Sequence, residues 1–327
     1  MRLLITSDNR EMLLIKETLR YSLSSSFAMK SLLLLALLGF CTALPLQVPS
    51  DIDQELFQNF TNGLVPPSEL VIGGSKAWRG QWPSQAFIKI QSRKQGSITC
   101  GGTLLTTKHI LTAAHCTIDA VGPTYVMVGL ININSDSRTP GVQVKKITRV
   151  GTNRHYTGDG LRAPHNDIAV LTLESDVTLS PYVKTVKILK DDSSLINRAK
   201  ATLTGFGTYT YRHGKPVSSP DLLYAEVDHV EQGWCKRRWS AVTKGQTILT
   251  NKQICAGSNG KGSGPGDSGG PLQVNVGGEW IQIGLVSFGV RDYPQMIDQA
   301  NYPAVYTRAS SYCDFITKAT HGDYKCY

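Results

Sequence analysis

A serine among glycines stands in the segment Gly264–Pro271, which reads Gly-Pro-Gly-Asp-Ser-Gly-Gly-Pro. Small neighbours let the backbone of a substrate approach the Ser268 hydroxyl, and a sharp turn leaves that hydroxyl exposed. Backbone N–H groups in such a turn can also point together and stabilise an oxyanion. The alternative is a flexible Gly/Pro turn without chemistry, so the interpretation depends on a base and an orienting acid elsewhere in the chain.

Two further segments supply that base and that acid. His115 stands between an apolar run and Cys116, and Asp167 directly precedes the apolar run 168–171. Taken singly, His115 could be a packed histidine or a metal ligand, and Asp167 could cap a turn. Together with Ser268 they provide the nucleophile, base and orienting carboxylate that activate a weak hydroxyl near neutral pH.

The motifs around these three residues resemble the trypsin/chymotrypsin family of serine endopeptidases. They run in family order over nearly all of residues 71–327, as the segments 71–74, 82–83, 100–102, 111–116, 167–169, 204–207, 255–257, 266–271, 287–289 and 305–307. The resemblance implies an all-β fold of two packed six-stranded antiparallel β-barrels, with the three residues in the cleft between them.

The elements that would position the site are short β-rich runs separated by Gly, Asn, Asp and Pro. Such spacing is typical of an antiparallel barrel or sandwich. The runs are 86–90, 125–128, 142–144, 168–171, 201–204 and 281–286. Helical periodicity is clear only around residues 312–319, which predicts a short C-terminal helix.

By resemblance, Ser268 attacks the scissile carbonyl, His115 takes its proton and Asp167 holds the imidazole. The N–H groups of Gly266 and Ser268 would form the oxyanion hole. The rival hypothesis is a catalytically silent homologue that acts as a binding protein. Such homologues usually lose one of the three residues, and this chain retains all of them.

The resemblance also implies activation by proteolysis. A cut between Leu70 and Val71 would free an ammonium group that pairs with Asp267 and orders the oxyanion hole. Because Leu70 stands where many zymogens carry Arg or Lys, we expect an activating protease that favours apolar residues, which could be this enzyme itself.

The expected specificity pocket lacks charge. Gly262 stands where trypsin-like enzymes carry the aspartate that receives Arg or Lys, and Gly289 and Ala304 are the other expected wall positions. Burial of an apolar side chain in such a pocket is favourable by ~1.5–3 kcal/mol. We expect a chymotrypsin-like preference for Phe, Tyr, Leu or Met, with an elastase-like preference as the alternative because the Ala304 methyl narrows the pocket.

Two segments adjoin this pocket. Ser287, Phe288 and Gly289 resemble the edge strand on which the substrate backbone lies, with Phe288 in place of the more usual tryptophan. The following loop is longer than usual, so that Asp292 or Asp298 could enter the pocket.

The N-terminal part resembles a targeting and processing region. A leucine run after Lys30 that ends in small residues near Ala43 describes a secretory signal peptide, and it is too short for the ~20 apolar residues that span a bilayer. We expect an upstream extension plus signal peptide over 1–43 with a true start at Met29, an acidic propeptide over 44–70 with a glycosylation sequon at Asn59, and a protease domain over 71–327.

The cysteines indicate an oxidising compartment and hence a secreted, extracellular protein. Removal of the signal peptide with Cys41 leaves six of the seven cysteines, an even set suited to three disulfides. By resemblance and by what then remains, the expected pairs are Cys100 with Cys116, Cys235 with Cys255, and Cys313 with Cys326.

Charge and residue spacing limit the partners. The net charge is +9, and residues 71–327 carry 29 basic and 18 acidic side chains, without an Arg-rich arm. We therefore expect protein or peptide substrates and protein protease inhibitors rather than specific nucleic-acid binding. We expect a monomer without a membrane span, a cofactor or a metal, since Leu130 stands where calcium-binding relatives carry an acidic ligand.

Overall fold

The computed structural model describes residues 71–327 apart from 136–137, 159–163, 197 and 199. The chain divides into two units, residues 1–64 and 65–327, and only the second contains described residues. The expected signal peptide, the acidic propeptide, the Asn59 sequon and Leu70 therefore lie outside the described residues.

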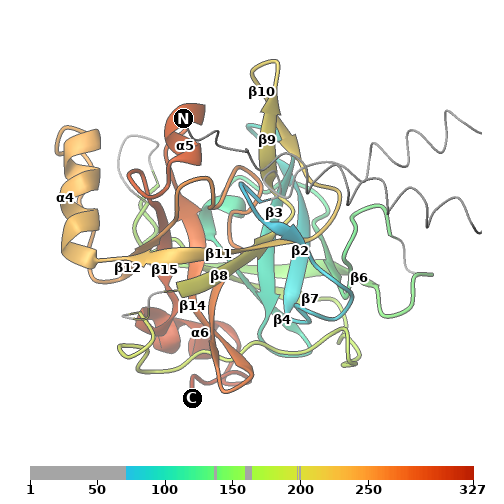
Figure 1. The fold of residues 1–327 in the computed structure, drawn as a ribbon. Helices are drawn as coiled ribbons and strands as arrows, with labels where there is room; N and C mark the ends of the chain where they lie inside the picture. Colours follow the sequence, from blue (N-terminus) through green and yellow to red (C-terminus); the bar gives the residue numbers. More distant parts are fainter. Residues whose placement is uncertain (1–70, 136–137, 159–163, 197, 199) are drawn as a thin grey trace, which may run out of the picture. The chain divides into compact units, whose positions relative to one another are not determined.

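Six strands of the N-terminal half close into an antiparallel β-barrel (Figure 1). In β2 (Gln85–Ser92), Ile88 and Ile90 are buried in the barrel while Lys89 and Gln91 face solvent, which is the alternation that a pleated strand imposes. The other strands are β3 (Gly96–Leu104), β4 (His109–Thr112), β5 (Tyr125–Val128), β6 (Gln143–Thr152) and β7 (Ala169–Leu173), and the barrel order is β2-β3-β4-β7-β6-β5.

Six strands of the C-terminal half form the second barrel, which closes because β8 pairs with both β11 and β13. Its core contains Leu203, Leu223, Ile254 and Tyr306, all fully or almost fully buried. The strands are β8 (Lys200–Gly205), β11 (Leu223–Val230), β12 (Gln253–Ala256), β13 (Pro271–Val276), β14 (Glu279–Phe288) and β15 (Ala304–Arg308), and the short β1 (Ser75–Lys76) is added to β11. The expected pair of six-stranded barrels is confirmed.

The helical segments are few. The expected C-terminal helix is present as α6 (Cys313–Ala319). The structure adds α4 (Gln232–Val242), α5 (Tyr293–Ile297) and a hairpin of β9 (Thr208–Arg212) and β10 (Lys215–Ser218). Helix α4 buries only Cys235 and Trp239, which are too few apolar positions to give a helical pattern in the sequence.

An apolar layer joins the two barrels. Leu111 of β4 and Val170 of β7 pack in one cluster with Leu285 of β14 and with helix α6. Because this layer is buried and close-packed, it fixes β4 and β7 against the second barrel. These are the strands whose ends lead to His115 and Asp167.

Three disulfides join Cys100 to Cys116, Cys235 to Cys255 and Cys313 to Cys326, which are the expected pairs. The first ties strand β3 to the 3₁₀ turn η1 (Ala114–Cys116), in which His115 lies. The second joins α4 to β12, and the third joins the first residue of α6 to the C-terminal tail.

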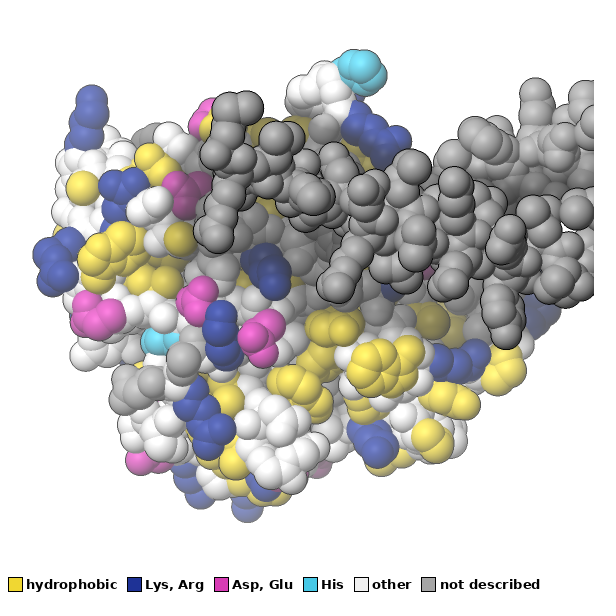
Figure 2. All heavy atoms as spheres, in the orientation of Figure 1, with side chains coloured by type: hydrophobic (Ala, Val, Ile, Leu, Met, Phe, Trp, Pro, Cys, Tyr) yellow, Lys and Arg dark blue, Asp and Glu magenta, His cyan; other side chains and the backbone are white. Residues whose placement is uncertain are grey.

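Basic side chains are spread over the described surface. Figure 2 shows Lys and Arg side chains separated by acidic and apolar ones on the face it draws. Helix α4 carries three consecutive basic residues, 236–238. The Arg238 side chain has partners, since its Nε donates to the carbonyl of Asn301 and its guanidinium lies 4.3 Å from the ring centroid of Tyr302. Among the described residues, no helix is both long and apolar enough to cross a membrane.

Candidate active site

His115 and Asp167 meet at the ends of two paired strands. Thr112 at the end of β4 pairs with Ala169 at the start of β7, so the residues just beyond these positions are neighbours. His115 Nδ1 lies 2.8 Å from Asp167 Oδ2, and the backbone N–H of His115 donates to Asp167 Oδ1 at 2.9 Å. One carboxylate therefore fixes both the ring and the backbone of the histidine.

Burial and hydrogen bonds set the charge of this pair. Asp167 is fully buried and accepts a third hydrogen bond from the Ser287 hydroxyl, 2.6 Å from Oδ2. Burial by itself would raise the pKa of Asp167, but the charge and hydrogen bonds of His115 and the bond from Ser287 lower that pKa overall. Burial would likewise lower the pKa of His115, and the Asp167 carboxylate offsets this so that the pKa is raised. We therefore assign the imidazole proton to Nδ1, which leaves Nε2 as an acceptor.

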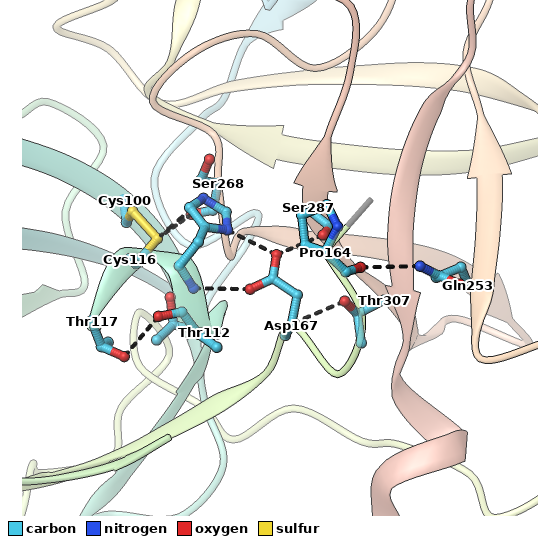
Figure 3. A network of polar contacts seen from close by, with 12 residues as sticks. Cys100, Thr112, Cys116, Thr117, Pro164, Asp167, Gln253, Ser268, Ser287 and Thr307 are labelled. Atoms are coloured by element: carbon cyan, nitrogen blue, oxygen red, sulfur yellow. Dashed lines mark hydrogen bonds and ion pairs between the residues drawn. A yellow bond between two sulfur atoms is a disulfide. The ribbon is translucent and has the colours of Figure 1, made fainter. Parts of the chain in front are cut away.

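Ser268 lies near the free side of the imidazole. Cys116 Sγ is 3.9 Å from His115 Nε2 and 3.7 Å from the Ser268 carbonyl oxygen, and that carbonyl accepts a hydrogen bond from Gly101 N–H at 2.8 Å. Figure 3 shows Ser268 next to the disulfide of Cys100 and Cys116. The Ser268 hydroxyl makes no hydrogen bond to His115 in this structure, so the two side chains are neighbours without a closed contact.

The sulfur atoms beside His115 are not available as ligands. Cys100, His115 and Cys116 place their possible ligand atoms within 4.8 Å of one another. Because the two cysteines form a disulfide, neither offers the thiolate that a metal ion requires, and the sulfur contacts of Cys116 are not thiol hydrogen bonds.

Two free backbone N–H groups stand in the serine turn. Within the described residues, the N–H groups of Gly266 and Ser268 make no hydrogen bond, whereas those of Asp267, Gly269 and Gly270 donate to Gly264, Val286 and Asp267. Gly266 has a φ of +99°, which an L side chain rarely adopts. The turn thus holds two unpaired donors beside the nucleophile candidate, which is the arrangement that binds an oxyanion.

Asp267 carries a buried carboxyl group. It is fully buried, and its oxygens accept the N–H groups of Gly207 at 2.8 Å and Gly264 at 2.9 Å. Burial raises the pKa of Asp267 to about 6 despite these two bonds. In the described part of the chain it has no cationic partner within salt-bridge distance.

The residues expected to line the specificity pocket differ in their surroundings. Gly289 borders open space, since an added Cβ would contact nothing within 4 Å. Ala304 is buried in β15, opposite Ala256. Ser287 binds Asp167 instead of facing an open pocket. The Phe288 ring packs edge-on against Trp239 of α4, with the centroids 5.0 Å apart.

The floor of that region differs from the expectation. The Gln299 carboxamide lies over Gly262, where an added Cβ would be 1.9 Å from its Oε1. The two aspartates that were expected as possible pocket residues lie elsewhere. Asp298 accepts a hydrogen bond from the Asn301 side chain, and Asp292 is exposed at the N-terminus of α5. The sequence carries no signal for Gln299, since the loop that contains it has no motif.

Comparison with known proteins agrees with the class that the fold and the site define, a serine endopeptidase. The family model described as Trypsin matches residues 71–316. Chymotrypsin-like elastase family member 1 of Homo sapiens is 32% identical over 262 residues, which cover 80% of this chain and 96% of the relative. The Macaca fascicularis protein of the same name is 31% identical over 264 residues (80% and 94%). The proclotting enzyme of Tachypleus tridentatus is 30% identical over 263 residues (76% and 65%). The chain belongs to the trypsin family.

Proposed function

We propose that this serine endopeptidase is a secreted zymogen whose processed form cleaves peptide bonds through Ser268, His115 and Asp167. The observation that carries the proposal is the fully buried Asp167, which holds Nδ1 of His115 at 2.8 Å. This leaves Nε2 near Cys116 Sγ, the atom that also contacts Ser268. A hydrogen bond from the Ser268 hydroxyl to Nε2 would complete the pair that activates a serine nucleophile.

The chemistry then follows from the roles of the three side chains. Ser268 Oγ attacks the scissile carbonyl carbon while its proton passes to His115 Nε2, and the imidazolium is stabilised by Asp167. The negative oxygen of the tetrahedral intermediate accepts from the N–H groups of Gly266 and Ser268. Collapse expels the amine, which takes the proton from Nε2, and water releases the acyl group by the same steps.

Activation by a cut between Leu70 and Val71 has two supports. Val71 has a φ of +43°, an unfavourable conformation for a β-branched residue, and the cut would remove that constraint. The buried, unpaired Asp267 would receive the new ammonium group of Val71, which already lies buried in the core of the second barrel. The ion pair would compensate a carboxylate that burial alone destabilises.

The proposed substrate preference is for apolar residues at the P1 position. The three atoms nearest a Cβ added at Gly262 all belong to the neutral carboxamide of Gln299, so this position offers no charge to Arg or Lys at P1. Two of the relatives carry the name chymotrypsin-like elastase, which matches the chymotrypsin-like and elastase-like preferences expected for this pocket. Secretion is supported by the three disulfides, which persist in oxidising compartments.

Hydrolysis of an unstructured protein by the processed enzyme tests the proposal. Casein should be cleaved by the protein cut at Leu70–Val71 and not by the uncut precursor, with new termini after apolar residues. Cleavage by neither form would favour the rival, a catalytically silent binding protein, and cleavage after Lys or Arg would contradict the pocket assignment.

The pH dependence of kcat/KM should report the pair His115–Asp167. Because only neutral His115 accepts the Ser268 proton, kcat/KM should fall as pH decreases through the raised pKa of His115, with a midpoint above the ordinary 6.5. Initial rates between about pH 5 and 9 give this midpoint. A midpoint below 6.5 in the wild type would contradict the assignment.

Replacement of Ser287 by alanine removes one hydrogen bond from Asp167 and should lower kcat/KM, while the fall of kcat/KM at low pH remains.

Asp267 should make the stability of the precursor depend on pH. Its pKa in the folded precursor, about 6, exceeds the ordinary 3.8, so the folded state holds the proton more tightly than the unfolded state. The stabilisation is complete below pH 3.8 and is lost as pH rises through 6, by about 3 kcal/mol in unfolding free energy. After the cut, the Val71 ammonium should lower this pKa and cancel the loss.

Urea unfolding of a Ser268→Ala protein, uncut and cut by an added protease, measures this difference without self-digestion. The stability gap between the cut and uncut forms should widen from about pH 4 to pH 7. A gap that stays constant over this interval would show that Asp267 does not receive the new terminus.

A further inference from the structure

The loop between β14 and β15 places a buried carboxamide in the proposed specificity pocket. Gln299 is 2% exposed, and its Nε2 donates to the Ser263 carbonyl oxygen at 2.7 Å. A Cβ on Gly262 would lie 1.9 Å from Gln299 Oε1 and 2.0 Å from its Cδ. The carboxamide therefore fills the space in which any side chain at position 262 would begin.

The backbone of this loop is held in place. A Cβ on Gly257 would lie 2.4 Å from the Cβ of Gln299, so the end of β12 packs closely on the loop. The N–H of Gly260 donates to the carbonyl of Ile297 at 2.7 Å, and the N–H of Asn301 donates to the carbonyl of Asp298 at 3.1 Å. Both sides of Gln299 are thus anchored, which supports a fixed position for its side chain.

The carboxamide is also fixed in orientation. Because Nε2 is used by the Ser263 carbonyl, Oε1 is the end that faces Gly262. This oxygen is buried and has no hydrogen-bond partner among the described residues. The amide has no net charge to balance an ammonium or guanidinium group at P1. Its volume over Gly262 also shortens the space that is left for a P1 side chain.

We propose that Gln299 forms the floor of the P1 pocket, makes it shorter than the glycines alone would, and selects Leu, Met and Val over Phe and Tyr. The inference rests on the proposed function and narrows it to shorter apolar residues. Gly262 then also makes room for the Gln299 carboxamide, because any larger residue at position 262 would have to displace it.

Peptides that differ only at P1 test the floor. Wild type, Gln299→Ala and the control Gln295→Ala are compared by kcat/KM on matched peptides with Val, Leu, Met, Phe, Tyr and Lys. Gln295 lies on α5 in the same loop, is partly exposed, and makes no side-chain hydrogen bond in the described part of the chain. Alanine at 299 keeps the Cβ that packs on Gly257.

The Phe-to-Leu ratio of kcat/KM should rise by at least about tenfold in Gln299→Ala and stay unchanged in Gln295→Ala. A ratio unchanged in Gln299→Ala, or raised equally by the control, overturns the inference. If Gln299→Ala does not fold, Gln299→Ser is measured by the same ratio. If the wild type cleaves the peptides but Gln299→Ala does not change the ratio, the proposed function stands and only the inference about Gln299 fails. If the wild type cleaves none of the peptides, the proposed function and the inference are both refuted.

A double substitution tests the coupling between the two positions. Gly262→Asp alone should not give cleavage after Lys, because the Gln299 carboxamide occupies the space of the new side chain. Gly262→Asp with Gln299→Ala should give it, so that the two effects are strongly non-additive. Equal cleavage after Lys by the single and double variants would contradict the placement of Gln299.

Discussion

Replacement of Ser268 by alanine should lower kcat of the processed enzyme by about 10⁶-fold, and replacement of His115 by alanine should lower it by a similar factor. Either change disables the same step, because the Ser268 hydroxyl is a poor nucleophile without a base and His115 activates the nucleophile only by taking the Ser268 proton. The double variant should therefore be no slower than either single variant, as in other serine proteases whose nucleophile and base act together.

The activity that remains in Ser268→Ala serves as a control for an intact oxyanion hole. The N–H groups of Gly266 and Ser268 remain when the Ser268 hydroxyl is removed, so some catalysis over the uncatalysed reaction should persist. Thermal unfolding should be nearly unchanged in Ser268→Ala, because the hydroxyl makes no hydrogen bond to any residue that the structure describes. Effects of the two single changes that multiply in the double variant would show that Ser268 and His115 act independently.

Replacement of Asp167 by asparagine should lower kcat by about 10⁴-fold, the effect known for the corresponding change in a related protease. The amide would still fill the buried site and could still accept the His115 backbone N–H, which lies 2.9 Å from Oδ1. Its nitrogen, however, would donate to Nδ1 and move the imidazole proton to Nε2, where it blocks transfer from Ser268.

Two comparisons separate this effect from a loss of structure. Ser287→Ala also changes the surroundings of Asp167, but it removes one neutral hydrogen bond and leaves the charge, so a much smaller loss is expected. Rates for Asp167→Asn are measured by initial-rate kinetics alongside its near-ultraviolet circular dichroism. Equal losses in the two variants would mean that Asp167 serves packing and not the orientation of the imidazole.

Much of the fold and of the site could be predicted from the sequence, because both depend on local patterns. Strand β2 shows its alternation of buried and exposed positions directly in Ile88 to Gln91. Asp167 stands one residue before a fully apolar run, and the pairing of β4 with β7 follows once both strands are placed in one barrel. The glycines beside Ser268 mark a turn that only glycine can form, as the φ of +99° at Gly266 shows.

The remainder depends on contacts between distant residues. Helix α4 buries only Cys235 and Trp239, and it contacts the site through the packing of Trp239 on Phe288. Gln299 belongs to a loop whose path is set by contacts with Gly257 and Gly260, which lie in the segment after β12. Neither contact leaves a periodic or spaced pattern, so the pocket could be predicted from Gly262 only as an empty space.

Reaction of the processed protein with a fluorophosphonate, followed by mass spectrometry of its peptides, shows whether Ser268 is an activated nucleophile. We expect one adduct per molecule on Ser268, loss of activity in proportion to labelling, and a much lower labelling rate in His115→Ala. An unlabelled Ser268 in the processed wild type, or labelling that does not depend on His115, would contradict the proposed role of Ser268.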